Sequence, residues 1–242
     1  MLSQNLTVHG LWIGERLSLM EQLTLRSFVA CGHRFVLWLY GRLEEDVPPG
    51  VEVRDANTII PRQRVFCYQA GIRPGSYAGF SDLFRYKLLY DSGGWWSDLD
   101  VVCLKPLDFD AWYAFHPHVD LGLVGSVLKA PPRTELMQRC ATWTAENVDE
   151  WNVVWTRPIR ILVHEAQRLG LGQYVLPAET ALVDWRDGEK YATTADRPPA
   201  SLHVLHWCNE WLNTRQFDKN APIPGTTYHN LLKCHGLLSS GT

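Results

Sequence analysis

The amino-acid sequence predicts an α/β protein with a mainly parallel central sheet flanked by helices. Short apolar, β-prone runs alternate with helical patterns through the first 110 residues, and glycine or proline separates them. The chain has 242 residues, a length that fits one α/β domain with a sizeable core. We therefore expect a single domain over residues 1–242, with its ligand crevice at the carboxyl ends of the strands.

The chain opens on a strand and a helix. Residues 6–13 (LTVHGLWI) are apolar and β-prone, and residues 17–30 have helical spacing. Gly32 stands where a helix cap is expected. Residues 34–40 (RFVLWLY) then predict a buried second strand, and Val51–Asp55 predict a shorter third.

The next predicted elements lead to an acidic pair. Breakers through residues 60–76 predict a short helix and a flexible loop that would serve as a lid. Residues 81–90 have helical spacing, and the Gly93-Gly94 pair ends that helix. Residues 95–104 (WWSDLDVVCL) begin polar and become a β-branched strand, which places the acidic pair at a strand edge.

The second half of the chain has weaker patterns. Residues 121–127 predict a strand, and residues 134–148 and 159–169 predict helices. From Pro177 onward the periodicity is low, so we expect ordered loops packed over the sheet.

Composition excludes several classes of function. The net charge of -3 and the pI near 6.3 do not favour nucleic acid as a partner. The six cysteines include no CxxC pair, so free thiols are expected rather than zinc sites or disulfides. The sequence shows neither a signal-peptide pattern nor a transmembrane run, which predicts a cytoplasmic protein.

Asp98 and Asp100 are the strongest candidates for chemistry. In an extended chain the two carboxylates project to the same side, with Leu99 facing away. Two such carboxylates can hold one hard divalent cation, Mn²⁺ or Mg²⁺, which keeps other positions for water and phosphate oxygens. By itself the D-x-D pattern also fits a solvated turn.

The surrounding sequence resembles a known family. SDLFRYKLLYDSGGWWSDLDVVCLKPLD, from Ser81 to Asp108, is similar to the signature S-D-x-x-R-x-x-x-L-x-x-x-G-G-x-Y-x-D-x-D of DXD-motif glycosyltransferases. The relatives are the Och1-like sugar transferases, the α-1,4-galactosyltransferase-like enzymes and the glucosylating bacterial toxins. The resemblance implies a GT-A-type nucleotide-sugar transferase fold, a divalent cation, and retention at the anomeric carbon.

The amino terminus carries a second resemblance. VHGLWIG looks like the I-H-x-x-W-x-G first strand of these enzymes, and GHRFVLWLYG resembles their second strand. The resemblance implies that Trp12 stacks on the nucleobase, with Ile13 and Gly14 beside it. Without the match, a core tryptophan at a strand end is an equally good interpretation.

Four further positions follow from the family signature. Asp82 would accept hydrogen bonds from donor-sugar hydroxyls, and Arg85 would offer its planar fork to the sugar or diphosphate. An intrahelical ion pair between the two is the structural alternative. Gly94, with Gly93, would let the backbone approach the donor, although a helix-ending turn needs glycine equally. Trp96 stands where the family commonly has tyrosine, which replaces a hydroxyl by an indole N–H.

The carboxyl-terminal contact of the family is matched only loosely. Its H-x-W-like motif corresponds best to HWCNEW, residues 206–211. His206 would ligate the cation or contact the diphosphate, and His203 competes for that role. Asn209 and Trp211 would touch phosphate or close the site. At residues 155–158 (WTRP), Arg157 replaces a glycine common in relatives, so acceptor specificity cannot be transferred.

The resemblance implies a metal-dependent hexosyltransferase. Residues 1–110 would form the nucleotide-sugar-binding half, and residues 111–242 the acceptor-side and closing half. UDP-linked donors are favoured by the context of Trp12, and GDP-mannose stays open. The acceptor is a glycan, a lipid-linked sugar, a protein, a small molecule or a modified base. A nucleotide-sugar hydrolase and a noncatalytic nucleotide-sugar-binding protein are the alternatives.

Overall fold

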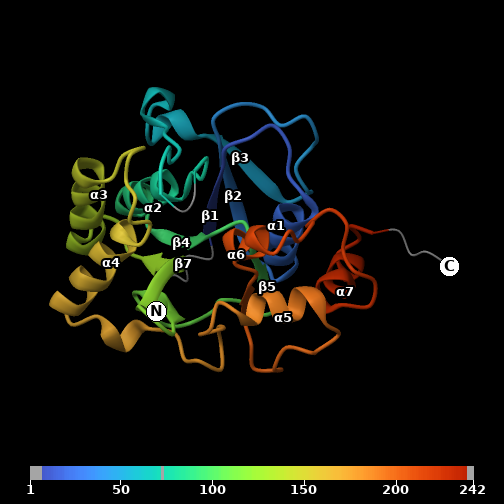
Figure 1. Ribbon diagram of the computed structural model, residues 1–242. Helices are drawn as coiled ribbons and strands as arrows, with labels where there is room; N and C mark the ends of the chain where they lie inside the picture. Colours follow the sequence, from blue (N-terminus) through green and yellow to red (C-terminus); the bar gives the residue numbers. More distant parts are fainter. Residues whose placement is uncertain (1–6, 72–73, 239–242) are drawn as a thin grey trace.

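The central sheet has six strands in the order β3-β2-β1-β4-β7-β6, in a computed structural model that describes residues 7–71 and 74–238 (Figure 1). The strands are β1 (Thr7–Trp12), β2 (Arg34–Leu39), β3 (Val51–Asp55), β4 (Gly94–Ser97), β6 (Ala114–His118) and β7 (Gly122–Ala130). The helices are α1 (Leu19–Ala30), α2 (Ala78–Ser92), α3 (Glu135–Asn147), α4 (Arg157–Arg168), α5 (Asp187–Thr193), α6 (Asn209–Thr214) and α7 (Thr227–Cys234).

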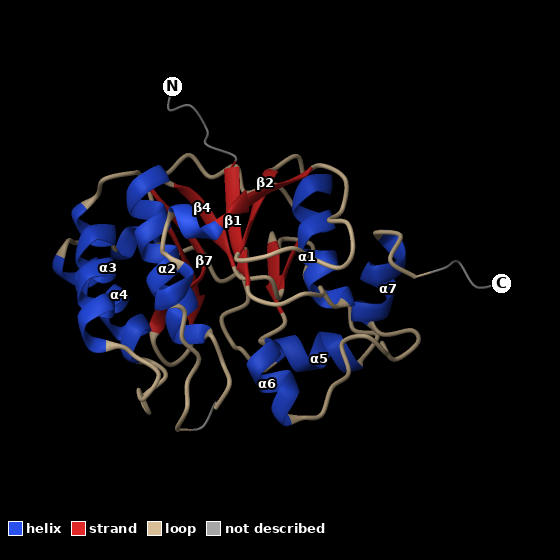
Figure 2. Ribbon diagram, turned by 90° about the horizontal axis from the view of Figure 1, so that it is seen from above, coloured by secondary structure: helices blue, strands red, loops and turns tan. Residues whose placement is uncertain are grey.

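Helices cover both faces of the sheet, as predicted. Figure 2 shows α2, α3 and α4 on one side and α1 on the other. The alternation of side chains along β2 explains these two layers, because neighbouring residues of a strand point to opposite faces. Val36 and Trp38 join the core under α2, whereas Phe35 and Leu37 join the core under α1.

The amino-terminal elements form as the sequence predicts. β1 pairs in parallel with both β2 and β4, and β2 pairs in parallel with β3. α1 begins with a capping box between Ser18 and Glu21, and Gly32 follows its end with a φ of 83°. Leu6, the first residue of the predicted opening strand, lies outside the described residues.

The segment between β3 and α2 contains two single-turn 3-10 helices, Ala56–Thr58 and Arg62–Arg64. Tyr68 anchors the following loop because its ring is buried and lies directly against Gly79 of α2, where a Cβ would come within 2.2 Å of the hydroxyl. Residues 72 and 73 of the predicted lid lie outside the described residues.

The acidic pair lies at a strand edge, as predicted, but residues 95–104 form parts of two strands rather than one, because the chain turns at that pair. β4 ends at Ser97, residues 98–100 form the turn, and β5 (Val101–Cys103) enters a second, two-stranded sheet with β8 (Val204–His206). Leu99 drives this turn, since it is buried against Gly10 of β1, where a Cβ would come within 2.8 Å of the leucine side chain.

The second half contains more regular structure than predicted. β6 was missed because its sequence, AFHPH, includes a proline and two histidines, and it forms through antiparallel pairing with β7. α5, β8, α6 and α7 replace the loops expected after Pro177. These elements are short, and tertiary contacts rather than periodicity stabilise them.

All six cysteines are free thiols. No helix within residues 7–71 or 74–238 is long and apolar enough to cross a membrane.

Candidate functional site

A pocket of about 510 Å³ opens at the carboxyl ends of β1 and β4. Trp12 lines it at the end of β1, Asp98 and Asp100 line it after β4, and Trp185 and Trp211 line it from the carboxyl-terminal half. The pocket therefore lies where a parallel sheet is expected to bind its ligand.

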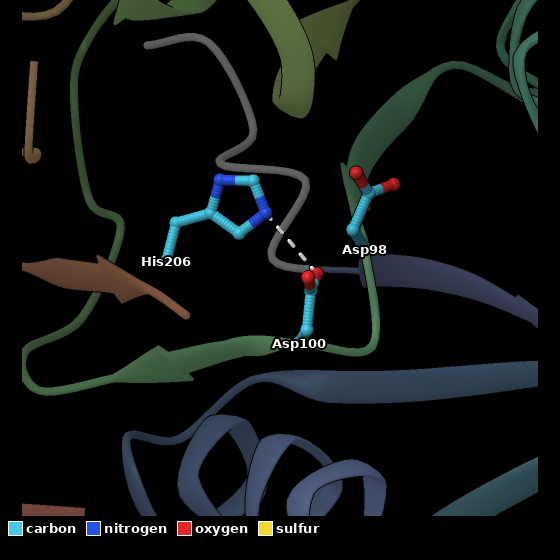
Figure 3. Close-up of side chains that lie close together, drawn as sticks. All are labelled: Asp98, Asp100 and His206. Carbon is cyan, nitrogen blue, oxygen red and sulfur yellow. Dashed lines mark ion pairs between the residues drawn. The ribbon is translucent and has the colours of Figure 1, made fainter. Parts of the chain in front are cut away.

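Asp98, Asp100 and His206 converge in this pocket (Figure 3). Each offers one ligand atom, and these atoms lie within 4.8 Å of one another. The pairing of β5 with β8 explains the convergence, because it sets Val101, next to Asp100, directly opposite His206. The turn at residues 98–100 thus brings together two carboxylates and a histidine distant in sequence.

The amino-terminal elements hold Asp98. Its Oδ1 accepts hydrogen bonds from Arg85 at 2.6 Å and from the Trp96 indole at 2.8 Å. The tryptophan that replaces the family's tyrosine therefore orients a member of the acidic pair. Burial raises the pKa of Asp98, Arg85 opposes that rise, and the charge of Asp100 adds to it.

Arg85 lies between two carboxylates. It pairs with Asp82 at 3.0 Å, three residues earlier in α2, as well as with Asp98, and it stacks on the Trp96 ring at 5.0 Å. Burial raises the pKa of Asp82 to about 7, although Arg85 acts in the opposite direction. Asp82 and Arg85 thus form the intrahelical pair and also line the pocket.

Gly125 of β7 makes room for this arginine. A Cβ at that position would come within 2.4 Å of an Arg85 guanidinium nitrogen. Any side chain there would displace Arg85, because real Cβ atoms do not approach so closely. Gly125 is thus a site residue that sequence reasoning missed, and nothing in its local sequence signals the role.

The carboxyl-terminal segment holds Asp100. Its Oδ2 accepts a hydrogen bond from the backbone N–H of Asn209 at 2.7 Å, and its Oδ1 lies 3.2 Å from His206 Nε2. Burial opposes the ionised form, but His206 and the Asn209 N–H outweigh it and lower the pKa of Asp100 to about 2. Asp100 is therefore a carboxylate at neutral pH.

Cys208 completes the surroundings of His206. Its Sγ lies 3.4 Å from His206 Nδ1, and its backbone is left-handed with a φ of 53°, which starts α6 beside the site. Burial opposes protonation of His206, yet Cys208 and Asp100 together raise its pKa well above the usual range. Cys208 was not predicted as a site residue.

His116 supports the His206 ring from β6. The ring centroids are 5.6 Å apart. Its Nε2 lies 2.7 Å from the Leu182 carbonyl, and its Nδ1 lies 3.0 Å from the Ser126 hydroxyl. Burial lowers the pKa of His116 to about 3, so the ring is neutral; Nε2 donates to the carbonyl and Nδ1 accepts from the hydroxyl. Sequence analysis missed His116 because it did not predict strand β6.

Trp12 faces the pocket with part of its indole. Lys219 lies over the ring at 5.8 Å and pairs with the buried Glu21 at 2.6 Å. The indole Nε1 is buried and has no hydrogen-bond partner among the described residues. Gly14 lies against the same indole, where a Cβ would come within 3.0 Å of Nε1.

Other predicted site residues lie elsewhere. Ile13 packs against the core, Gly94 is buried in β4, and neither lines the pocket. Gly93 caps α2 and lies against Pro132. His203 Nδ1 donates to the Pro106 carbonyl, 2.9 Å away, and His203 is not part of the cluster that contains His206.

The remaining predicted residues are at the rim. Asn209 and Trp211 line the pocket from α6, and the Trp211 indole donates to Glu189 at 2.6 Å. Trp155 and Thr156 also line it, whereas the Arg157 guanidinium contacts the Asn147 carbonyl.

Sequence comparison identifies the segment that contains Asp98 and Asp100. Residues 46–118 match the family described as "Glycosyltransferase sugar-binding region containing DXD motif". This segment of the chain is therefore similar to a DXD glycosyltransferase region. The match confirms the predicted resemblance and covers α2, β4 and the acidic pair.

Structure comparison supports the same fold. The solved structure of "PaToxG Glycosyltransferase" aligns with a TM-score of 0.50 and 12% sequence identity, over 69% of this chain and 70% of that one. At this identity the likeness concerns the fold, and it confirms the predicted glycosyltransferase-type α/β architecture. No curated protein sequence matches the chain significantly.

Proposed function

We propose that this DXD glycosyltransferase domain transfers a hexose from a nucleotide-sugar donor to an acceptor, with retention of anomeric configuration and with a divalent cation. The observation that carries the proposal is the Asp98, Asp100 and His206 cluster inside a pocket that Trp12 also lines. A UDP-linked donor is favoured because an indole that lines the pocket suits a flat nucleobase.

The residues present fit a divalent cation. Two carboxylate oxygens and one imidazole nitrogen converge within 4.8 Å, a spacing that one ion can bridge. Carboxylates suit Mg²⁺ and Mn²⁺, and the imidazole favours the transition metal, so Mn²⁺ is the better candidate. When bound, the cation would neutralise charge on the diphosphate leaving group.

The protein's own residues would have distinct roles. Asp100, the carboxylate with the lowered pKa, would be the direct ligand together with His206. Asp98 would contact the ribose or a metal-bound water. Asp82 and Arg85 line the pocket and would bind the donor sugar. The leaving phosphate oxygen would accept the acceptor's proton on the same face of the sugar.

The proposal also assigns a role to each half of the chain. Residues 1–110 would bind the nucleotide sugar, and residues 111–242 would supply the acceptor side and close the site. Asn209 and Trp211 would contribute to that closure from α6. A cytoplasmic location also stays a prediction, which cell fractionation would test.

The test is nucleotide release from a panel of UDP- and GDP-sugars in the presence of Mn²⁺, Mg²⁺ or EDTA. We expect slow release from one donor, dependent on Mn²⁺ and abolished by EDTA. Release that is equally fast in EDTA would contradict the metal role. No release and no metal-dependent nucleotide binding would contradict the enzyme assignment.

A further inference from the structure

The β6–β7 hairpin projects beyond the acidic pair. β4 pairs with β7 as far as Ser97 and Val127, whereas β6 and β7 continue to pair as far as His118 and Gly122. At roughly 3.4 Å per residue, the stretch from Val127 to Gly122 carries the hairpin about 17 Å farther. The hairpin turn at residues 119–121 therefore extends over the site.

The hairpin turn at residues 119–121 is distant from Trp12. β1 and β6 are separated in the sheet by β4 and β7. Three strand spacings correspond to about 14 Å. A base at Trp12 and a group at the hairpin turn can thus occupy the pocket together, with Asp98 and Asp100 between them.

Asp120 and two indoles form a corner at the hairpin end. The Trp185 indole N–H donates to Asp120 at 3.3 Å, and the Trp185 and Trp211 rings meet edge to face at 4.5 Å. Arg186 lies over the Trp185 ring at 5.2 Å, and Arg215 lies over the Trp211 ring at 4.2 Å. The two rings are thus held in place, and both line the pocket.

The carboxylates around this corner are already engaged. Arg186 pairs with Asp184 through two nitrogens, at 2.7 Å each, which lowers the pKa of Asp184. Glu210 accepts the Ser76 hydroxyl at 2.7 Å. Arg186 compensates the charge of Asp184, whereas Asp120 accepts from a neutral indole N–H, so an anionic acceptor would be repelled at this corner. Two indoles beside carboxylates suit a sugar ring, which offers a C–H face to the aromatic ring and hydroxyl donors to the carboxylates.

We infer that the corner formed by Asp120, Trp185 and Trp211 is the acceptor subsite, and that the acceptor is an uncharged saccharide. The C–H face of a sugar ring would lie against the Trp185 indole, and its hydroxyls would donate to Asp120 and Asp184. This inference rests on the proposed function, because it names the acceptor for the same pocket. In the transfer, the acceptor hydroxyl oxygen bonds to the anomeric carbon, the bond to the nucleotide diphosphate breaks, and the hydroxyl proton goes to the diphosphate.

The experiment measures nucleotide release from the active donor, with and without added acceptors. Neutral mono- and disaccharides, amino sugars and peptides rich in lysine, serine or threonine are the probes. We expect a neutral saccharide to accelerate release and to be recovered in glycosylated form. Acceleration by peptides or amino sugars alone would overturn the inference, as would donor turnover that no saccharide changes. No turnover of any donor would instead refute the proposed function itself.

Variants locate the subsite. Trp185→Ala should raise the KM for the saccharide at least tenfold and change the KM for the donor less than twofold, and Trp185→Phe should recover part of the loss. Trp112→Ala, at a tryptophan that is 54% exposed and outside the pocket, is the matched control. An unchanged saccharide KM in Trp185→Ala, or equal rises in both KM values, would place the acceptor elsewhere.

Discussion

The pocket has an amino-terminal wall, formed by β1, β4 and α2, and a carboxyl-terminal wall, formed by β8 and α6, and each wall holds one carboxylate of the acidic pair. Asp98 is held by Arg85 and Trp96, from α2 and β4, and its pKa is raised. Asp100 is held by His206 and the Asn209 N–H, from β8 and α6, and its pKa is lowered to about 2. One turn thus presents a carboxylate that the protein already pairs with an arginine and another that stays ionised for a cation.

The largest expected effect is a loss of stability when Arg85 is removed from the amino-terminal wall. Arg85→Ala would leave the buried Asp82 and the partly buried Asp98 without their shared cation. Breaking a buried pair in this way costs about 3–5 kcal/mol in the free energy of unfolding. Chemical denaturation would measure the loss. Arg160→Ala, at an exposed position of α4, should change stability by less than about 0.5 kcal/mol, and equal effects of the two variants would refute the role of Arg85.

Trp96→Phe separates the hydrogen bond to Asp98 from the packing of the ring. The variant keeps an aromatic ring under Arg85 but loses the indole N–H. A hydrogen bond to a charged group contributes about 1.5–3 kcal/mol, so its loss should lower the free energy of unfolding by up to that amount. Trp95→Phe, at a buried tryptophan of the same strand that belongs to the other core, is the matched control for the lost volume. Stability unchanged from the parent would mean that Asp98 does not depend on the indole.

Trp12→Ala tests whether the same wall binds the base. UDP affinity should fall by about 1–3 kcal/mol, the range for base–aromatic stacking. Titration calorimetry with UDP and Mn²⁺ would measure it, and Trp151→Ala, at a ring that is 65% exposed, is the control. Unchanged affinity would return Trp12 to a packing role.

Two histidines with opposite pKa shifts extend the comparison to the pH dependence of stability. His206 has a raised pKa, whereas burial, with Arg54, lowers the pKa of His9 in β1 to about 4. The unfolded chain then binds a proton at His9 near pH 6.5 and the folded protein does not. The stabilising contribution of neutral His9 is therefore complete above pH 6.5 and declines toward pH 4, by at most about 1.4 kcal/mol per pH unit. Denaturation at several pH values should show a shallower decline in His9→Asn, and an identical slope would contradict the assignment.

The sequence predicted the amino-terminal wall far better than the carboxyl-terminal one. α2 and the strands before it have strong periodicity and clear glycine caps, so these elements could be predicted from the pattern. Asp82, Arg85 and Asp98 were assigned to one site through the family resemblance. The turn at residues 98–100 could not be predicted. It depends on the packing of Leu99 against Gly10, which lies in a strand far away in the sequence.

The carboxyl-terminal wall depends on tertiary pairing. His206 reaches the acidic pair only because three-residue strands β5 and β8 pair, and such short elements have no periodicity to detect. His116 depends on a strand that contains Pro117, and Gly125 depends on the position of Arg85. The loose H-x-W resemblance nevertheless led to His206, and the cluster contains it rather than His203.

The most direct test of the account is Mn²⁺ binding in the presence of UDP, measured by calorimetry for the parent protein, Asp100→Asn and the control Asp110→Asn, whose side chain lies outside the pocket. We predict that Asp100→Asn stays folded but loses Mn²⁺-dependent UDP binding and nucleotide release. Its melting temperature should fall, because the carboxylate contacts with His206 and the Asn209 N–H stabilise the fold. Asp110→Asn should behave like the parent. Full Mn²⁺-dependent binding and activity in Asp100→Asn would contradict the assignment of the acidic pair as the cation site.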